Sequence, residues 1–204
     1  MVNRLLVVVL SLLFSCNKAE IIRSEEPHGY LEAHKENFIK EKEVKRVAVQ
    51  ARFLEPYNAA LNQLGDKVYK IKAKRDSVLS LNANALSFVV SFNSLDKVAL
   101  SKVNIYTPEE YHQRIYQLAY DMAAYFSITT SSGTLQPVMV TTDYQMDAVD
   151  GIKFLVQFEV DSDLKKEWIK KEEDIKLSFN DPFWQLGKLN FTYKAHKILD
   201  LNTL

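Results

Sequence analysis

The chain of 204 residues carries 26 basic and 26 acidic side chains, and 47% of its residues are hydrophobic. A balanced charge gives no broad positive field, so we expect no nucleic acid among its partners. The apolar content, with 11% aromatic residues, is far above that of disordered chains and predicts a packed hydrophobic core.

Residues 1–15 have the composition of a secretory signal peptide. Arg4 gives the amino terminus a positive charge, and Leu5 to Phe14 form a nearly unbroken apolar segment that is followed by the small residue Ser15. The segment is too short to cross a bilayer as a helix, which takes roughly 17–25 apolar residues. We therefore expect residues 1–15 to be removed during export.

The single cysteine of the chain, Cys16, directly follows this segment. Leu13, three residues before it, and Ser15, immediately before it, resemble the lipobox of bacterial lipoproteins. The resemblance covers residues 1–17 and implies that Cys16 becomes the first mature residue, with a diacylglycerol on its sulfur and often an acyl chain such as palmitate on its amine. More than one chain is needed because a single acyl chain holds a protein at a membrane only reversibly. The alternative is an ordinary secreted protein.

The residue after Cys16 is Asn17. In Gram-negative lipoproteins an aspartate at this place commonly retains the protein in the inner membrane, so the resemblance implies an outer-membrane anchor that faces the periplasm or the exterior. Removal of residues 1–15 takes away Arg4 and no acidic residue, which leaves 25 basic and 26 acidic side chains. Because no second cysteine is present, stability must come from the core and not from disulfides.

The rest of the chain is organised as a tether and a domain. The tether follows the lipidated cysteine within residues 16–29, which are polar and interrupted by Pro27 and Gly29. Its residues 17–29 span up to about 45 Å when extended. Residues 30–204 suit a single domain. At its start, residues 30–46 carry interleaved charges and few apolar side chains, which predicts a solvated helix or loop.

Period-two alternation of apolar residues predicts the strands of this domain. The alternating segments are 46–53, 84–94, 138–144, 152–160, 175–179 and 189–195. A turn at Asp147 to Gly151 joins two of them into a hairpin. The fold class is therefore α+β, with an antiparallel sheet or sandwich of about six strands and one or two packed helices.

Helical spacing and capping motifs predict the helices. One follows Pro56, and a short charged one that carries Leu164 and Trp168 is capped by Asp161 or Ser162. The clearest helix start is T-P-E-E at residues 107–110, a capping box with proline at the first helical position. Two apolar stripes are assigned to the core: Tyr57, Leu61, Leu64, Val68 and Ile71, and Tyr111, Ile115, Leu118, Met122 with Tyr125 or Phe126.

Known chemical motifs are missing from the sequence. The four histidines do not show H-E-x-x-H spacing, the five glycines form no nucleotide-binding loop, and G-x-S-x-G does not occur. We therefore expect no cofactor, no metal site and no enzymatic activity. An active site assembled by the fold from distant residues stays open, because such sites are defined by geometry and not by sequence order.

One group of acidic residues has the ligand chemistry of a calcium site. Its members are Asp143, Asp147, Asp150, Asp161 and Asp163. Their spacing misses the EF-hand pattern, and aspartate with glycine is also what a reversing loop needs for its own backbone. We therefore favour a role in the turn.

The turn at residues 180–188 holds the candidate docking residues Phe183, Trp184 and Leu186. Large apolar side chains at a turn either fold back on the core as a plug or stay exposed for a protein or a glycan. A buried plug needs no partner and is the favoured interpretation; we expect Phe183 to be buried as the plug and Trp184 to be partly exposed. The expected function is an accessory or binding component of a cell-envelope complex. A lipid-anchored periplasmic hydrolase and a surface glycan-binding protein are the alternatives.

Overall fold

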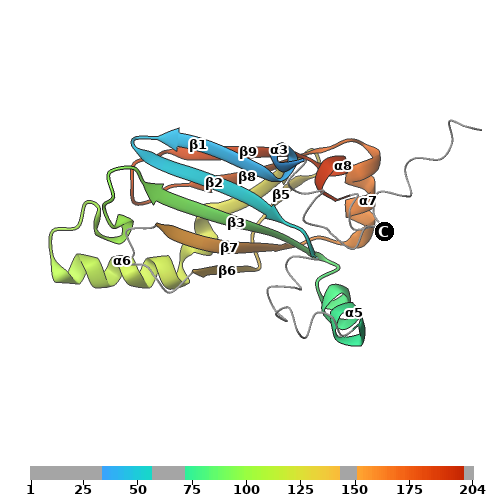
Figure 1. Ribbon diagram of the computed structural model, residues 1–204, viewed down its shortest axis with the longest axis horizontal. Helices are drawn as coiled ribbons and strands as arrows, with labels where there is room; N and C mark the ends of the chain where they lie inside the picture. Colours follow the sequence, from blue (N-terminus) through green and yellow to red (C-terminus); the bar gives the residue numbers. More distant parts are fainter. Residues whose placement is uncertain (1–33, 57–71, 143–150, 200–204) are drawn as a thin grey trace, which may run out of the picture. The chain divides into compact units, whose positions relative to one another are not determined.

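The computed structural model describes residues 34–56, 72–142 and 151–199. Within these ranges, nine strands form two antiparallel sheets (Figure 1). The strand order is β1-β2-β3-β7-β6 in the first sheet and β5-β4-β8-β9 in the second. The expected α+β class with antiparallel strands is confirmed.

The bounds of the elements follow the chain. The strands of the first sheet are β1 (Ile39–Val44), β2 (Val47–Leu54), β3 (Ala85–Ser94), β6 (Met139–Thr142) and β7 (Ile152–Glu159). Those of the second are β4 (Phe126–Thr130), β5 (Gly133–Leu135), β8 (Asp174–Asn180) and β9 (Lys188–Lys194). The helices are α3 (Lys35–Phe38), α5 (Lys72–Leu81), α6 (Pro108–Tyr120), α7 (Ser162–Lys170) and α8 (Ala195–Ile198), with 3-10 turns η1 (Leu100–Lys102) and η2 (Met122–Tyr125).

The two sheets meet through aromatic rings. Successive side chains of a strand point to opposite faces, and the inward residues of β3, from Leu86 to Phe92, are fully buried. The ring centroids of Phe92 and Phe179 lie 4.9 Å apart. The hydroxyl of Tyr193, whose pKa is raised by burial, donates a hydrogen bond of 2.7 Å to the carbonyl oxygen of Ala51. The interface therefore contains both ring packing and a hydrogen bond that fixes the sheets against each other.

Six of the nine strands were predicted, and three were not. The apolar alternation of β2, β3, β6, β7, β8 and β9 made them recognisable. The expectation of a solvated helix or loop at residues 30–46 is wrong for residues 39–44, which form β1. The other two missed strands are β4, which directly follows η2, and β5, which has three residues. The predicted helix at residues 57–71 and most of the predicted turn at 147–151 lie outside the described residues.

The sequence of β1, IKEKEV, hides its strand because it lies at the edge of the first sheet. Its charged residues alternate, so no apolar period marks it. Lys40 and Lys42 lie over the rings of Tyr193 and Phe191, with the ammonium nitrogens 5.9 and 5.7 Å from the ring centroids. The aliphatic stems of such lysines cover aromatic surface while their charges stay near water.

Both predicted helix caps are confirmed. The Glu110 amide donates to Thr107 Oγ1 at 3.2 Å, and Glu110 Oε2 accepts from the Thr107 amide at 3.2 Å. Asp161 Oδ1 accepts from the Asp163 amide at 2.7 Å and caps α7. In the stripe of α6 and its continuation, Leu118, Met122 and Phe126 are buried, whereas Tyr111, Ile115 and Tyr125 are half-buried.

A buried lysine joins α7 to the start of β3. The side chain of Lys165 is 6% exposed, and its Nζ donates to the carbonyl oxygens of Ala83 and Ala85 at 2.6 and 2.9 Å. Burial lowers the pKa of Lys165 to about 8. The two hydrogen bonds satisfy backbone groups of the turn that precedes β3, at the cost of desolvating an ammonium group.

This pKa predicts a pH dependence of stability. Between the folded pKa of about 8 and the ordinary value of 10.5, the unfolded chain binds more protons at Lys165 than the folded protein. The contribution of Lys165 to the free energy of unfolding therefore rises with pH in this window. From pH 7.5 to 9.5, the free energy of unfolding of wild type, measured by urea denaturation, should rise by about 1–2 kcal/mol relative to that of Lys165→Met. The rise is smaller than the full pKa difference implies because the ammonium group keeps some hydration. Lys170→Met, on the exposed side of α7, is the control and should show no such gain. Equal pH dependence in wild type and Lys165→Met would contradict the assignment.

Candidate functional site

The turn that carries the candidate docking residues is folded into the core. Phe183, Trp184 and Leu186 are 7, 4 and 7% exposed. The indole Nε1 of Trp184 donates to the carbonyl oxygen of Leu100 at 2.9 Å, and its ring lies 5.0 Å from that of Phe92. This burial agrees with the plug interpretation. It corrects the expectation that Trp184 is partly exposed, and it leaves no aromatic docking surface at this turn.

The carboxylate of Asp181 explains why the turn folds inward. It accepts hydrogen bonds from the backbone amides of Phe183, Trp184 and Leu186 at 2.8, 2.9 and 2.7 Å. Three amides gathered on one side chain curl the backbone, so the intervening side chains are directed at the core. The sequence shows the aspartate but not the direction of this curl.

The plug is held from the other side by α6. Arg114, 8% exposed, places its guanidinium carbon 4.3 Å from the centroid of the Phe183 ring and donates to the carbonyl oxygen of Val103 at 3.3 Å. Burial lowers the pKa of Arg114, and the nearby charge of Asp181 opposes this effect. The arginine was not predicted as a core residue, because the apolar stripe of α6 contains no signal for a buried charge.

A hollow of about 410 Å³ opens on the first sheet. It is lined by three strands, with residues Glu41, Lys42 and Glu43 of β1, Ala48, Val49 and Gln50 of β2, and Asn93 of β3. None of these residues was singled out in the sequence, because β1 was not recognised as a strand. Recognition of β1 and β2 as a hairpin would have placed Glu41 and Glu43 beside the amide of Gln50.

Strand register places the polar groups of the hollow on one face. Glu41 lies opposite Gln50, and Ala48 lies opposite both Glu43 and Asn93. The Gln50 Nε2 donates to Glu41 Oε1 at 2.7 Å, which orients both side chains. The small side chain of Ala48 leaves space between Glu43 and Asn93. The hollow thus combines carboxylates and carboxamides over a small apolar floor.

The backbone around the hollow is tightly constrained. Lys45 and Arg46 join β1 to β2 with φ of 48° and 63°, a conformation that favours glycine or asparagine. Arg46 Nε bonds Asp96 Oδ1 at 2.7 Å, so the turn is tied to the end of β3. At Gly151, with φ of 102°, an added Cβ would lie 2.3 Å from the backbone carbonyl oxygen of Phe92 and 2.2 Å from Asn93 Oδ1, so another residue would force the backbone to shift. The backbone contacts on this side of the first sheet therefore fix the shape of the hollow.

Acceptors predominate in the hollow. The carboxylate oxygens of Glu41 and Glu43 and the amide oxygens of Gln50 and Asn93 are acceptors, and the two amide nitrogens are the donors. The side chain of Lys42 lies on the other face of β1, over the ring of Phe191. Such a lining suits a ligand that offers hydroxyl, amide or ammonium donors. In the described ranges, no group of three or more His, Cys, Asp or Glu side chains is placed to hold a metal ion.

The acidic cluster considered as a calcium site is only partly described. Asp161 caps α7, and Asp163 pairs with Lys166 at 2.9 Å. Asp143, Asp147 and Asp150 lie outside the described residues. The two described members therefore serve the start of a helix.

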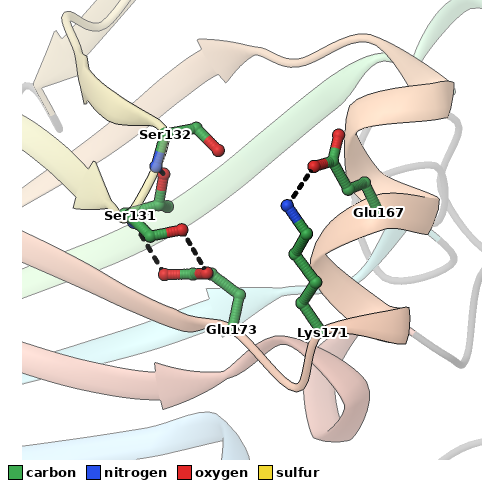
Figure 2. A network of polar contacts seen from close by, with 6 residues as sticks. Ser131, Ser132, Glu167, Lys171 and Glu173 are labelled. Carbon is green, nitrogen blue, oxygen red and sulfur yellow. Dashed lines mark hydrogen bonds and ion pairs between the residues drawn. The ribbon is translucent and has the colours of Figure 1, made fainter.

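A second polar network joins the β4–β5 turn to the segment before β8 (Figure 2). The Glu173 carboxylate accepts from the Ser131 amide at 2.7 Å and from Ser131 Oγ at 2.6 Å, which lowers the pKa of Glu173. Lys171 and Glu167 form a separate ion pair of 2.5 Å on α7 and the residue after it. In Figure 2 Ser131 faces the Glu173 carboxylate directly, so the network closes the turn between β4 and β5.

Comparison with known proteins assigns no family. No family model matches the sequence, and no curated protein is similar to it. Among solved structures, the chain is similar to a crystal structure of a protein of unknown function from Burkholderia pseudomallei, with 11% identity and a TM-score of 0.40 over 86% of this chain and 88% of that chain. None of the described helices is long and apolar enough to span a membrane.

The plug predicts a large stability loss for Trp184→Ala. The substitution removes a buried indole and its hydrogen bond to Leu100, so the free energy of unfolding should fall by about 3–5 kcal/mol. Each kcal/mol lowers the melting temperature of a domain of this size by about 2–4 °C, which calorimetry resolves. Tyr120→Ala, at a side chain that is 73% exposed, is the control. Equal melting temperatures for the two variants would contradict the plug.

Proposed function

We propose that the protein is a lipid-anchored binding component of the bacterial cell envelope, attached to the outer membrane through acyl chains on Cys16. The observation that carries the proposal is the order of charge, apolar run, Leu13, Ser15 and Cys16 at the start of the chain. The hollow on β1, β2 and β3 is its site for a partner in an envelope complex.

The placement of the hollow supports this proposal. The chain enters the first sheet at Ile39, opposite Arg52, whereas the tight turn at Val44 and Val47 lies at the other end of β1. A strand of six residues is about 20 Å long. The hollow lies toward the turn, so the end of the sheet that binds is not the end that follows the tether.

Glycan binding is a second candidate for the same envelope protein. Carboxylates and carboxamides of the hollow match the hydroxyl groups of a sugar. In addition, Tyr116 and Tyr120 of α6 are 59 and 73% exposed, with ring centroids 5.0 Å apart. Exposed aromatic faces of this kind stack well on the apolar faces of sugar rings.

The anchor is tested by Cys16→Ala. We expect the wild-type protein to incorporate a fatty-acid analogue and to sediment with membranes. The variant should lose the label and either leave the membrane or accumulate as uncleaved precursor. Ser15→Gly, which keeps a small residue before the cysteine, is the control and should still be labelled. A labelled, membrane-bound Cys16→Ala protein would refute the anchor.

The hollow is tested by charge reversal. Glu43→Lys reverses a charge in the lining of the hollow. Glu159→Lys, the control, makes the same change at the last residue of β7, outside the hollow. Tagged full-length proteins are cross-linked in membranes, solubilised and purified. We expect Glu43→Lys to reduce recovery of the cross-linked partner by about tenfold or more, as for the loss of a buried polar contact, with an unchanged melting temperature. Recovery that is reduced equally by Glu159→Lys would argue against the hollow.

A further inference from the structure

The two carboxylates in the hollow on β1, β2 and β3 carry negative charge that no cation of the described chain neutralises. Glu41 and Glu43 form no ion pair within the described ranges. The side-chain hydrogen bond that the structure gives to this pair runs from Gln50 Nε2 to Glu41 Oε1, and it leaves the carboxylate of Glu43 unpaired. A neutral amide orients a carboxylate but does not compensate its charge.

The basic residues nearby are engaged elsewhere or lie outside the lining. Lys42 lies on the other face of β1, and Arg46 pairs with Asp96 at 2.7 Å. Lys45 is in the tight turn and Arg52 lies further along β2, and neither of them lines the hollow. A cation that compensates the two carboxylates is therefore expected from a ligand.

Strand geometry leaves room for a planar group beside Glu43. Glu43 and Asn93 lie on the two sides of Ala48 in one row of the sheet. Two strand spacings separate their backbones by about 10 Å, and the residue between them contributes a methyl group. Glu41 lies on the same face of β1 as Glu43, about 7 Å away along the strand. A flat side-chain group above Ala48 thus has a carboxylate within reach on one side and a carboxamide on the other.

We propose that the hollow binds the guanidinium group of an arginine on the partner protein, with Glu43 as its bidentate acceptor and Glu41 as the second carboxylate. This inference deepens the proposed function and rests on it, because it names the group of the partner that enters the hollow. A guanidinium offers five N–H donors in a planar fork that matches carboxylates, whereas an ammonium is a compact point charge. The carboxamides of Gln50 and Asn93 then meet the N–H and C=O groups of the peptide that carries the arginine.

The lining favours a cationic side chain over a sugar. None of its seven residues is aromatic, so the hollow gives a sugar ring no surface for stacking. The exposed rings of Tyr116 and Tyr120 belong to α6 and are not part of the lining. Two carboxylates on one face of a strand also repel each other, and a cation relieves this repulsion where a hydroxyl group does not.

The test is an NMR titration of the full-length, lipidated, ¹⁵N-labelled protein in detergent micelles. The signals followed are the side-chain amide of Gln50 and the backbone amide of Ala48, both in the lining. The probes are the N-acetyl amides of arginine, citrulline and lysine, and a disaccharide of N-acetylglucosamine. Citrulline has nearly the shape of arginine without its charge. Glu43→Gln removes one carboxylate of the hollow, and Glu159→Gln, outside it, is the control.

We expect the arginine amide to shift both signals in a saturable manner, with the citrulline and lysine amides binding at least about threefold more weakly. Glu43→Gln should weaken binding of the arginine amide by about threefold or more, added salt should weaken it further, and Glu159→Gln should leave it unchanged. An equal response to the citrulline or lysine amide, a stronger response to the disaccharide, or unchanged binding in Glu43→Gln would each overturn the arginine site.

The cross-linking experiment separates this inference from the proposed function. If the arginine amide shows no preference while Glu43→Lys still reduces recovery of the cross-linked partner, the guanidinium assignment is wrong and the partner site stands. If Glu43→Lys leaves recovery of the partner unchanged, the partner site fails, and the arginine contact fails with it.

Discussion

The fold depends on the packing of aromatic rings between the two sheets. Phe92 of β3 touches rings from three sources: Phe154 of its own sheet, Phe179 of the other sheet, and Trp184 of the turn that closes the β8–β9 hairpin. Neither sheet can bury its apolar face alone, so each provides the surface that the other needs. The hydrogen bonds of Asp181 are what bring the third component, the plug, into this contact.

The sequence predicts the strands whose inward residues are apolar. It does not predict a strand at the edge of a sheet whose residues lack this apolar alternation. β3 and β7 lie inside the first sheet and show clear alternation, whereas β1 lies at its edge and alternates charges. The same limit applies to the sites. A signal at Cys16 is local and readable, but the hollow requires that Glu43 and Asn93 be brought to one residue of β2 by register. Burial of Trp184 follows from three amide hydrogen bonds that no local pattern reveals.

Each end of the first sheet carries a costly local arrangement. At one end, the strained turn of Lys45 and Arg46 and the close approach of Gly151 to Asn93 fix a polar surface. At the other end, the buried ammonium of Lys165 secures the turn that carries α5. Costly local arrangements are retained when the surrounding fold over-determines them, and such positions are frequent at functional sites.

The charged edge strand would have a further consequence under the proposed attachment to a membrane. Attachment to a surface concentrates molecules in two dimensions and aligns them, which favours pairing between exposed strand edges. A strand with free amide and carbonyl groups along one side is a template for such pairing, and charged side chains on it oppose the approach of an identical strand. With Lys40 and Lys42 folded over aromatic rings and Glu41 and Glu43 on the other face, β1 presents like charges to a second copy on either side. The same charges that conceal β1 from sequence analysis thus oppose aggregation through this edge when the surface density is high.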